Sequence, residues 1–221
     1  QDFPPMGFVG DDGEFTGFDL EMAAEVAKRL NLMIAYQPIA WDAKDMELDA
    51  GTIDCIWNGF TMNGREDDYE WSKPYMKNNQ VFVVRGDSDI NSEADLAGKN
   101  VEVQTDSSAE AALNDNSELT STFGSLTPVA DYNTAFMDLE SGAVDAIAMD
   151  DVVASYQITS RKADFKVLDD VIAAEEYGIG FKKGNTGLRD KVQATLEEMA
   201  ADGTAAKISE KWFGKDITTI Q

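Results

Sequence analysis

The 221-residue sequence contains no histidine and only one cysteine, Cys55. The lack of histidine excludes Ser-His-Asp and Cys-His catalysis and every histidine-based metal site. A single cysteine excludes an internal disulfide, and we interpret Cys55, inside the apolar run 53–57, as a structural thiol. No Asp-x-Asp-x-Asp-Gly calcium loop is present, and Asp11-Asp12-Gly13 is better explained as a turn. We therefore expect neither a metal nor a cofactor.

Basic residues are also scarce, since 18 lysines and arginines stand against 42 aspartates and glutamates and give a net charge of −24. This balance disfavours binding to nucleic acid or to an anionic membrane through a basic patch. No apolar run approaches the ~20 residues that span a bilayer. The sequence shows no signal peptide, so we expect the mature form if the protein is secreted.

Strand-like apolar runs alternate with segments of helical periodicity, which predicts an α/β protein with largely parallel sheets. Helices are predicted over about 18–30, 43–49, 109–113, 132–140, 151–156 and 188–201, with a last helix from Thr204. Strands are predicted over 33–36, 53–57, 81–84, 101–103, 144–148, 167–168 and 177–181.

The stretch from Asn58 to Arg65 follows the apolar run 53–57 and combines backbone groups at a strand end, a hydroxyl and a guanidinium. Arginine offers a rigid fork of donors that matches two carboxylate oxygens, and such charge-assisted pairs are strong. The stretch therefore suits a carboxylate ligand. The alternative is a surface turn in which Arg65 pairs with Glu66 or Asp67.

Residues 41–56 overlay on residues 132–147 without a gap, and both contain a helix, a Gly stop, an Asp turn and an apolar strand. We interpret this as a structural repeat. Two similar lobes would each present a strand end, where ligands bind in open α/β sheets, and ligands favour clefts between domains. A zwitterion would then satisfy Arg65 after one strand and Asp150 after the other. Helix capping is the alternative role for Asp150, although Asp151 is equally suited to it.

Four further side chains are candidates on local grounds. Ser107 and Ser108 stand where a predicted strand leads into a helix N-terminus, whose exposed N–H groups attract anions. Ordinary N-capping is the alternative for at least one of them. Phe3 and Trp41 are placed to sandwich an apolar ligand stem in the first lobe, or else belong to its core.

These residues resemble the polar amino-acid family of ABC-transporter solute-binding proteins, also called bacterial extracellular solute-binding protein family 3. The resemblance covers nearly the whole chain. The matching motifs, in family order, are Phe3-Pro4-Pro5-Met6-Gly7-Phe8, Gly17-Phe18-Asp19-Leu20, Asn58-Gly59-Phe60-Thr61 with Arg65-Glu66, Trp71-Ser72-Lys73-Pro74-Tyr75, Leu96-Ala97-Gly98-Lys99, Val144-Asp145-Ala146 to Asp150, Tyr177-Gly178-Ile179-Gly180-Phe181, and Asp202-Gly203-Thr204 to Lys211-Trp212-Phe213-Gly214.

The resemblance implies a two-lobed clamshell of the periplasmic-binding-protein type 2 fold, each lobe a mainly parallel sheet flanked by helices. The first lobe would comprise 1–77 and 179–221, and the second 78–178. Hinge segments are expected near 76–80 and 173–177. The family normally has a first β-strand before Phe3 that this sequence lacks, so we expect either a truncated sequence or another segment in its place. The spacing from Thr61 to Arg65 is also shorter than the commoner pattern, which predicts a tighter loop.

The resemblance also implies the roles of the site residues. The position of Arg65 grips the ligand α-carboxylate, helped by the backbone around Thr61 and by the turn at 107–108. The position of Asp150 takes the α-ammonium, with Gly59 and Thr61. The implied ligand-binding set, with no catalytic residue, is Phe3, Trp41, Asn58, Gly59, Phe60, Thr61, Arg65, Gln104, Ser107, Ser108, Met149 and Asp150.

In the family, the positions of Phe3 and Trp41 flank the ligand side chain, and those of Gln104 and Met149 help to select it. Because the last two are uncharged here, we expect a neutral polar L-amino acid such as glutamine or cystine. The implied protein is a monomeric, periplasmic or extracellular receptor, with or without a lipid anchor, that delivers its ligand to the permease of an ABC importer. The alternatives are the sensor module of a receptor or engineered biosensor, and a cyclohexadienyl-dehydratase-like enzyme.

Overall fold

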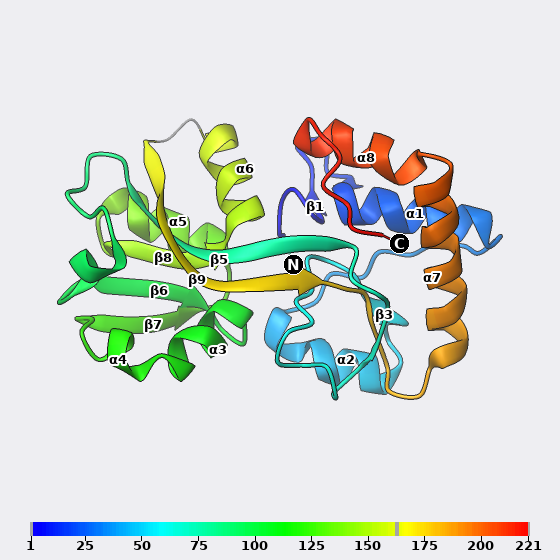
Figure 1. Ribbon diagram of the computed structural model, residues 1–221, viewed down its shortest axis with the longest axis horizontal. Helices are drawn as coiled ribbons and strands as arrows, with labels where there is room; N and C mark the ends of the chain where they lie inside the picture. The colour runs from blue at the N-terminus through cyan, green and yellow to red at the C-terminus, as the bar shows by residue number, and fades with distance from the viewer. Residues whose placement is uncertain (1, 162–163, 221) are drawn as a thin grey trace. The chain divides into compact units, whose positions relative to one another are not determined.

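The computed structural model describes residues 2–161 and 164–220, and the chain divides into two compact units. Unit 1 comprises Gln1–Lys77 and Glu175–Gln221, and unit 2 comprises Asn78–Ala174 (Figure 1). The two units share the long strands β5 and β9, each of which begins in one unit and ends in the other. The expected hinge segments stay a prediction.

Unit 1 combines helices with very short strands (Figure 1). Helices α1, α7 and α8 pack on one another. Its three-stranded sheet has the order β3-β10-β4, and both pairings are antiparallel. The elements of unit 1 are β1 (Phe8–Val9), β2 (Phe15–Thr16), α1 (Phe18–Arg29), the 3-10 helix η1 (Trp41–Ala43), α2 (Lys44–Ala50), β3 (Cys55–Ile56), β4 (Glu70–Trp71), β10 (Gly180–Phe181), α7 (Thr186–Ala201) and α8 (Thr204–Phe213).

Unit 2 contains a five-stranded sheet of order β7-β6-β8-β5-β9, in which β6 runs parallel to β7 and β8, and β5 runs antiparallel to β8. Helices α3, α5 and α6 pack against its strands. Its elements are β5 (Met76–Arg85), the 3-10 helix η2 (Glu93–Leu96), β6 (Asn100–Gln104), α3 (Ser108–Asp115), α4 (Ser117–Thr120), β7 (Ser125–Val129), α5 (Tyr132–Ser141), β8 (Ala146–Asp150), α6 (Asp151–Arg161) and β9 (Phe165–Tyr177).

Strand alternation decides which side chains of unit 2 share a face. On β5, Phe82 and Val84 belong to the apolar core that contains Val101, Ala148 and Leu113 of α3. The polar side chains that precede them at the same spacing, Asn78 and Gln80, therefore lie on the same face as this core. The register places Gln80 opposite Asp150, the last residue of β8.

The α/β class is confirmed, and the helices predicted from periodicity and Gly stops are present. The predicted helix 18–30 is α1, 132–140 is α5 and 188–201 is α7. These segments carry their own start, face and stop signals, so their identity depends little on distant parts of the chain.

The overlay of 41–56 on 132–147 has a counterpart in backbone hydrogen bonds. Thr52 N–H donates to Glu47 O at 3.1 Å, and the equivalent Ala143 N–H donates to Asp138 O at 2.9 Å. One residue earlier, the N–H groups of the two Gly stops donate to the carbonyls of Leu48 and Leu139, both at 3.2 Å. This pattern is the Schellman type of helix ending. The two αβ corners thus end their helices in the same way.

Three sequence predictions are wrong. The predicted strand 33–36 forms neither strand nor helix, because no segment among the described residues pairs with it, and Met33 is fully exposed. Without it, the sheet of unit 1 contains antiparallel pairs, not the mainly parallel sheet expected there. Asp42, expected to cap a helix, instead lies in η1, and α2 starts after Ala43 without a side-chain cap.

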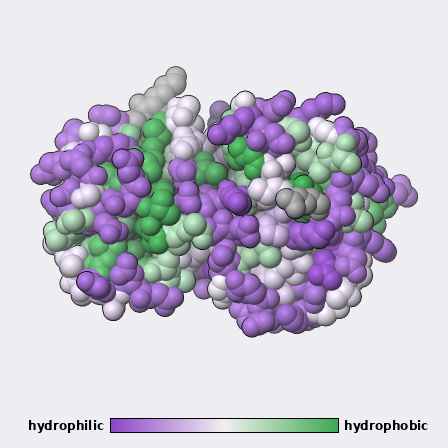
Figure 2. Space-filling model, viewed as in Figure 1, coloured by the Kyte–Doolittle hydropathy of each residue, from purple (hydrophilic) through white to green (hydrophobic). Residues whose placement is uncertain are grey.

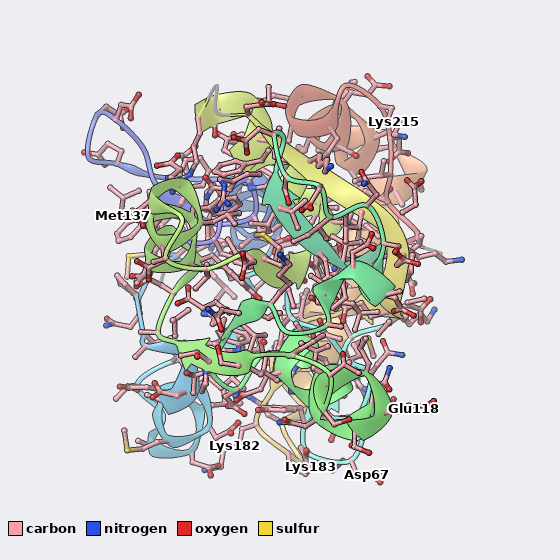
Figure 3. All side chains as sticks on the ribbon, turned by 90° about the vertical axis from the view of Figure 1, so that its left-hand side faces the viewer. Asp67, Glu118, Met137, Lys182, Lys183 and Lys215 are labelled. Carbon is pink, nitrogen blue, oxygen red and sulfur yellow. The ribbon has the colours of Figure 1, made fainter. Side chains whose placement is uncertain are left out.

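The surface of the protein is largely hydrophilic (Figure 2), in agreement with the excess of acidic residues in the sequence. Figure 2 shows hydrophilic residues over most of the visible face. Two lysines at the turn after β10, Lys182 and Lys183, are labelled in Figure 3. They connect this turn to other segments, since Lys182 Nζ donates to Asp49 O at 2.7 Å and Lys183 Nζ to Tyr69 O at 3.3 Å.

Gly17, immediately before α1, gives a first prediction. Its φ is 137°, and an added Cβ would lie 2.3 Å from Met6 O, a backbone atom that cannot move aside cheaply. We expect Gly17→Ala to lower the free energy of unfolding by about 2–3 kcal/mol. Gly187→Ala is the matched control, because Gly187 lies in α7 with open space around it and alanine should add up to ~1 kcal/mol. Urea denaturation measures both, and equal effects would contradict the prediction.

Candidate functional site

The first half of the candidate site is the segment 57–65, called here the Arg65 loop, which leaves unit 1 strand β3. The backbone of this loop forms hydrogen bonds with the end of β9 and the residue that follows it. Met62 N–H donates to Glu176 O at 2.9 Å, Gly178 N–H donates to Phe60 O at 2.9 Å, and Thr61 forms an antiparallel bridge with Tyr177. These bonds hold the loop as a short extension of a sheet.

The Arg65 side chain is oriented by its own loop. Nη1 donates to Thr61 O at 3.3 Å, and the guanidinium carbon lies 5.4 Å from the centroid of the Phe60 ring. Phe60 is fully buried and packs against Tyr69 and Trp71, with ring centroids 5.0 and 4.7 Å away. A cation held over a ring in this way is attracted by the ring quadrupole and is partly ordered before an anion arrives.

Phe3, Asn58 and Gly59 come together at the start of the Arg65 loop. Asn58 Nδ2 donates to Gly7 O at 3.3 Å. Gly59 has a φ of 58°, and an added Cβ would lie 2.6 Å from Cε1 of Phe3. The glycine is needed both for its left-handed backbone and for the close approach of the Phe3 ring. Two residues predicted to bind ligand thus hold each other in place.

Asp19, in the first turn of α1, is a functional candidate that the sequence analysis missed. Its Oδ2 accepts a hydrogen bond from Gly59 N–H at 2.7 Å and another from the Tyr75 hydroxyl at 2.8 Å. The side chain has no solvent exposure. Burial raises the pKa of Asp19 to about 7, although the hydrogen bonds from Gly59 and Tyr75 lower it.

A signal for Asp19 was present in the helical periodicity. Asp19 shares the spacing i, i+3, i+7 with Met22 and Val26, which form the buried face of α1. A charged residue on the apolar stripe of a helix indicates either a buried partner or a function. Here the partners are Gly59 and Tyr75.

The second half of the candidate site surrounds Asp150 in unit 2. Asp150 is 5% exposed, and its Oδ1 accepts hydrogen bonds from Asn78 Nδ2 and Gln80 Nε2, both at 2.9 Å. Gln80 Nε2 also lies 3.0 Å from Ser108 Oγ, in the first turn of α3. The carboxylate is therefore held by two neutral amide donors, and Gln80 connects it to the start of α3.

The two serines have different positions. Ser107 is the N-cap of α3, with its Oγ accepting from Glu110 N–H at 3.1 Å, so the N-capping alternative is confirmed for this residue. Ser108 is the first residue of α3 and contacts Gln80. At the start of α6, Val152 N–H donates to Asn78 Oδ1 at 3.4 Å. Asn78 thus joins the Asp150 carboxylate to the beginning of α6.

Gln104 and Met149 lie on neighbouring strands, β6 and β8. Gln104 is nearly buried, and its Nε2 donates to Ala130 O at 3.4 Å. Met149 is fully buried opposite Val81, and strand alternation directs it to the face opposite that of Asp150. Their role in choosing the ligand stays a prediction.

Trp41 packs edge-on against Phe60, with ring centroids 5.3 Å apart. The nearby Lys44 was not recognised in the sequence. Its side chain is only 2% exposed, and Nζ lies 5.4 Å from the centroid of the Trp41 ring. A buried ammonium therefore accompanies the aromatic group of unit 1.

Cys55 is a further chemistry-bearing residue of unit 1. Burial raises the pKa of the Cys55 thiol to about 12, as expected of a structural cysteine. No group of three or more potential metal ligands was found in the described part of the chain. Within residues 2–161 and 164–220, no helix combines the length and apolar character needed to cross a membrane.

The chain as a whole matches the model of one protein family. The model of the family described as bacterial extracellular solute-binding proteins, family 3, matches residues 1–215. The chain belongs to this family. It is similar to the L-cystine-binding protein TcyJ of Escherichia coli K12, with 33% identity over 98% of this chain and 81% of the relative. It is also similar to the L-cystine-binding protein TcyA of Bacillus subtilis, with 32% identity over 94% of this chain and 76% of the relative.

Solved structures agree in fold. An ABC uptake transporter substrate-binding protein from Streptococcus pneumoniae with bound histidine is 34% identical, with a TM-score of 0.95 over 98% of this chain and 91% of the other. An ancestral arginine-binding protein bound to glutamine is 36% identical, with a TM-score of 0.88 over 96% and 94%. These neighbours have the two-lobed periplasmic-binding-protein fold, and all the relatives named here are binding proteins.

The buried Asp19 predicts an unusual dependence of stability on pH. Because its pKa is raised in the folded state, folding takes up a proton above the ordinary pKa of 3.8, and stability is lost as the pH rises through about 7. From about pH 5 to about pH 8, the unfolding free energy of the unaltered protein should fall by about 2–3 kcal/mol relative to that of Asp19→Asn. Urea denaturation in 0.5 M salt at each pH measures this. The exposed Asp115→Asn should retain the slope of the unaltered protein, and an equal slope in Asp19→Asn would disprove the assignment.

Proposed function

We propose that the protein is a monomeric extracytoplasmic receptor that binds one polar L-α-amino acid and delivers it to the permease of an ABC importer. Arg65 binds the α-carboxylate, assisted by the backbone around Thr61 and by the turn at 107–108. Asp150, held by Asn78 and Gln80, binds the α-ammonium. The proposal gives each unit one of the two charges of the ligand.

The observation that carries this proposal is that two side chains of opposite charge, Arg65 and Asp150, are each held in place by neighbouring residues. A guanidinium is oriented over Phe60 in unit 1, and a nearly buried carboxylate is oriented by two amides in unit 2. Both follow strands that end equivalent αβ corners, since β3 precedes the Arg65 loop and β8 ends at Asp150. An α-amino acid offers the matching carboxylate and ammonium, and charged groups in such sites are best oriented in advance.

We further propose that the ligand side chain is neutral. Lys44 already places an ammonium over Trp41, and Arg65 places a guanidinium over Phe60, so a cationic side chain would meet positive charge at both rings. Gln104 and Met149 supply no charge of their own. The similarity to two L-cystine-binding proteins supports cystine as a first candidate, and glutamine is a second.

Arg65 provides the first test of the function. Arg65→Ala should weaken amino-acid binding by about 2–5 kcal/mol, because one partner of a desolvated charge pair is removed. Arg65→Lys should fall between, since lysine keeps the charge without the fork. Calorimetry with L-cystine, L-glutamine, L-arginine and L-histidine measures the change. Arg189→Ala, in α7, is the control and should bind normally. Unchanged affinity in Arg65→Ala, or no binding of any α-amino acid, would refute the function.

Asp150 provides the complementary test. Asp150→Asn keeps the shape and removes the charge, so it should cost about 2–5 kcal/mol for an amino acid. The deaminated analogue of the same ligand lacks the ammonium, and the Asn variant should bind it at least as well as the unaltered protein does. Competition calorimetry compares the two ligands, with the exposed Asp115→Asn as control. A loss of equal size for both ligands would show that Asp150 acts only on the fold.

A further inference from the structure

We propose that Asp19 is the positioning residue of the Arg65 loop and that its ionisation is coupled to amino-acid binding, with tighter binding at alkaline than at acidic pH. This inference rests on the proposed function, because the Arg65 loop is its carboxylate-binding half. It adds a proton to the binding equilibrium and assigns that proton to one buried side chain.

The geometry makes Asp19 a support for the loop and not a part of its surface. One oxygen, Oδ2, accepts both the Gly59 N–H at 2.7 Å and the Tyr75 hydroxyl at 2.8 Å. Gly59 is held in a left-handed conformation, two residues before Thr61, whose carbonyl accepts from Arg65. A change in the Asp19–Gly59 bond therefore acts directly on the backbone that leads to the guanidinium.

The groups that face Asp19 are few. Tyr75, just before β5, is the titratable one, and burial raises its pKa well above the ordinary value, so it stays a donor at all relevant pH. From the Arg65 loop come Gly59 N–H and Trp57, neither of which titrates. From the N-terminal turn comes Met6, whose carbonyl accepts from Asp19 N–H at 2.8 Å. Among described residues, Asp19 forms no salt bridge with a cationic side chain.

The amino-acid composition allows the titration of Asp19 to be measured without interference from histidine. The chain has no histidine, so no ordinary side chain changes its charge near neutral pH. Asp19 does change its charge near neutral pH, because its burial and hydrogen bonds give it a pKa of about 7. The α-amino terminus is the other common group in this range, and it is unchanged in any Asp19 variant.

The sign of the pH dependence of binding follows from the strength of the hydrogen bonds to Asp19. An ionised carboxylate accepts more strongly than a neutral acid, so the ionised form holds Gly59 and Tyr75 more firmly. If the ligand prefers the loop in that state, linkage requires that ligand also lowers the pKa of Asp19 and that binding releases a proton near pH 7. Strengthening one such bond corresponds to roughly fivefold in affinity.

Calorimetry of the full chain, produced without a histidine tag, tests the proposal. The probe is the tighter binder of L-glutamine and L-arginine, because neither side chain titrates between about pH 5.5 and about pH 8.5. Affinity should rise roughly fivefold over this range. Repetition at pH 7 in buffers of different ionisation enthalpy should show release of a fraction of a proton. In Asp19→Asn, which retains an acceptor oxygen, both effects should disappear.

Two further variants separate positioning from general stability. Tyr75→Phe removes a hydrogen bond that lowers the pKa of Asp19, so the midpoint of the affinity profile should move to higher pH. This variant also decides the question if Asp19→Asn does not fold. Glu102→Gln removes another buried carboxyl whose pKa burial raises, in β6, and should leave the profile unchanged.

The outcomes distinguish this inference from the function itself. Amino-acid binding that is independent of pH, or equally pH-dependent in Asp19→Asn, overturns the role of Asp19 and leaves the receptor function standing. Loss of the pH dependence in Glu102→Gln would overturn it as well. Absence of binding at every pH would refute the proposed function.

Discussion

A fully buried carboxylate is the constraint on which unit 1 depends. No cationic side chain pairs with Asp19 among residues 2–161 and 164–220, and removing its charge from water costs several kcal/mol. Its position in the first turn of α1 offsets part of that cost through the positive end of the helix, and the hydrogen bonds from Gly59 and Tyr75 offset more. In return, one side chain connects α1, the Arg65 loop at Gly59 and the start of β5 at Tyr75. A neutral core could not fix three separate backbone segments with comparable directionality.

The two half-sites show how one αβ corner can serve opposite charges. Both corners end a helix with the same hydrogen bonds at Gly51 and Gly142. They differ at the start of the helix, where Asp131 caps α5 and α2 has no side-chain cap, and again after the strand. The strand of the first corner, β3, continues into the Arg65 loop, which is hydrogen-bonded to the end of β9. The strand of the second corner, β8, ends at Asp150 and leads directly into α6. Similar scaffolds thus place strand ends, and the following residues decide whether a cation or an anion is offered.

Sequence reasoning succeeded where a segment carries its own signals and failed where it depends on a distant partner. Helix α5 was predictable because Asp131 caps it and a glycine ends it. The segment 33–36 was predicted as a strand from composition, but a strand needs a neighbour to pair with. Arg65 and Asp150 were proposed as site residues from residue type and strand ends, and their roles stay a prediction. Asp19 was missed because the candidates came from strand ends and loops, although its spacing with Met22 and Val26 placed it on the buried stripe of α1.

Strand β5 gives the last step of this synthesis. It begins beside Tyr75, which holds Asp19, and it carries Asn78 and Gln80, which hold Asp150. One continuous strand therefore supports the residues that orient both proposed charges, on either side of the boundary between the two units. Beyond that boundary β5 pairs with β8 from Gln80 to Val84, and this ladder fixes the backbone of Gln80 opposite Asp150. The side chains that orient the two proposed ligand-binding charges are thus close along the chain, with Tyr75 in unit 1 and Asn78 and Gln80 in unit 2.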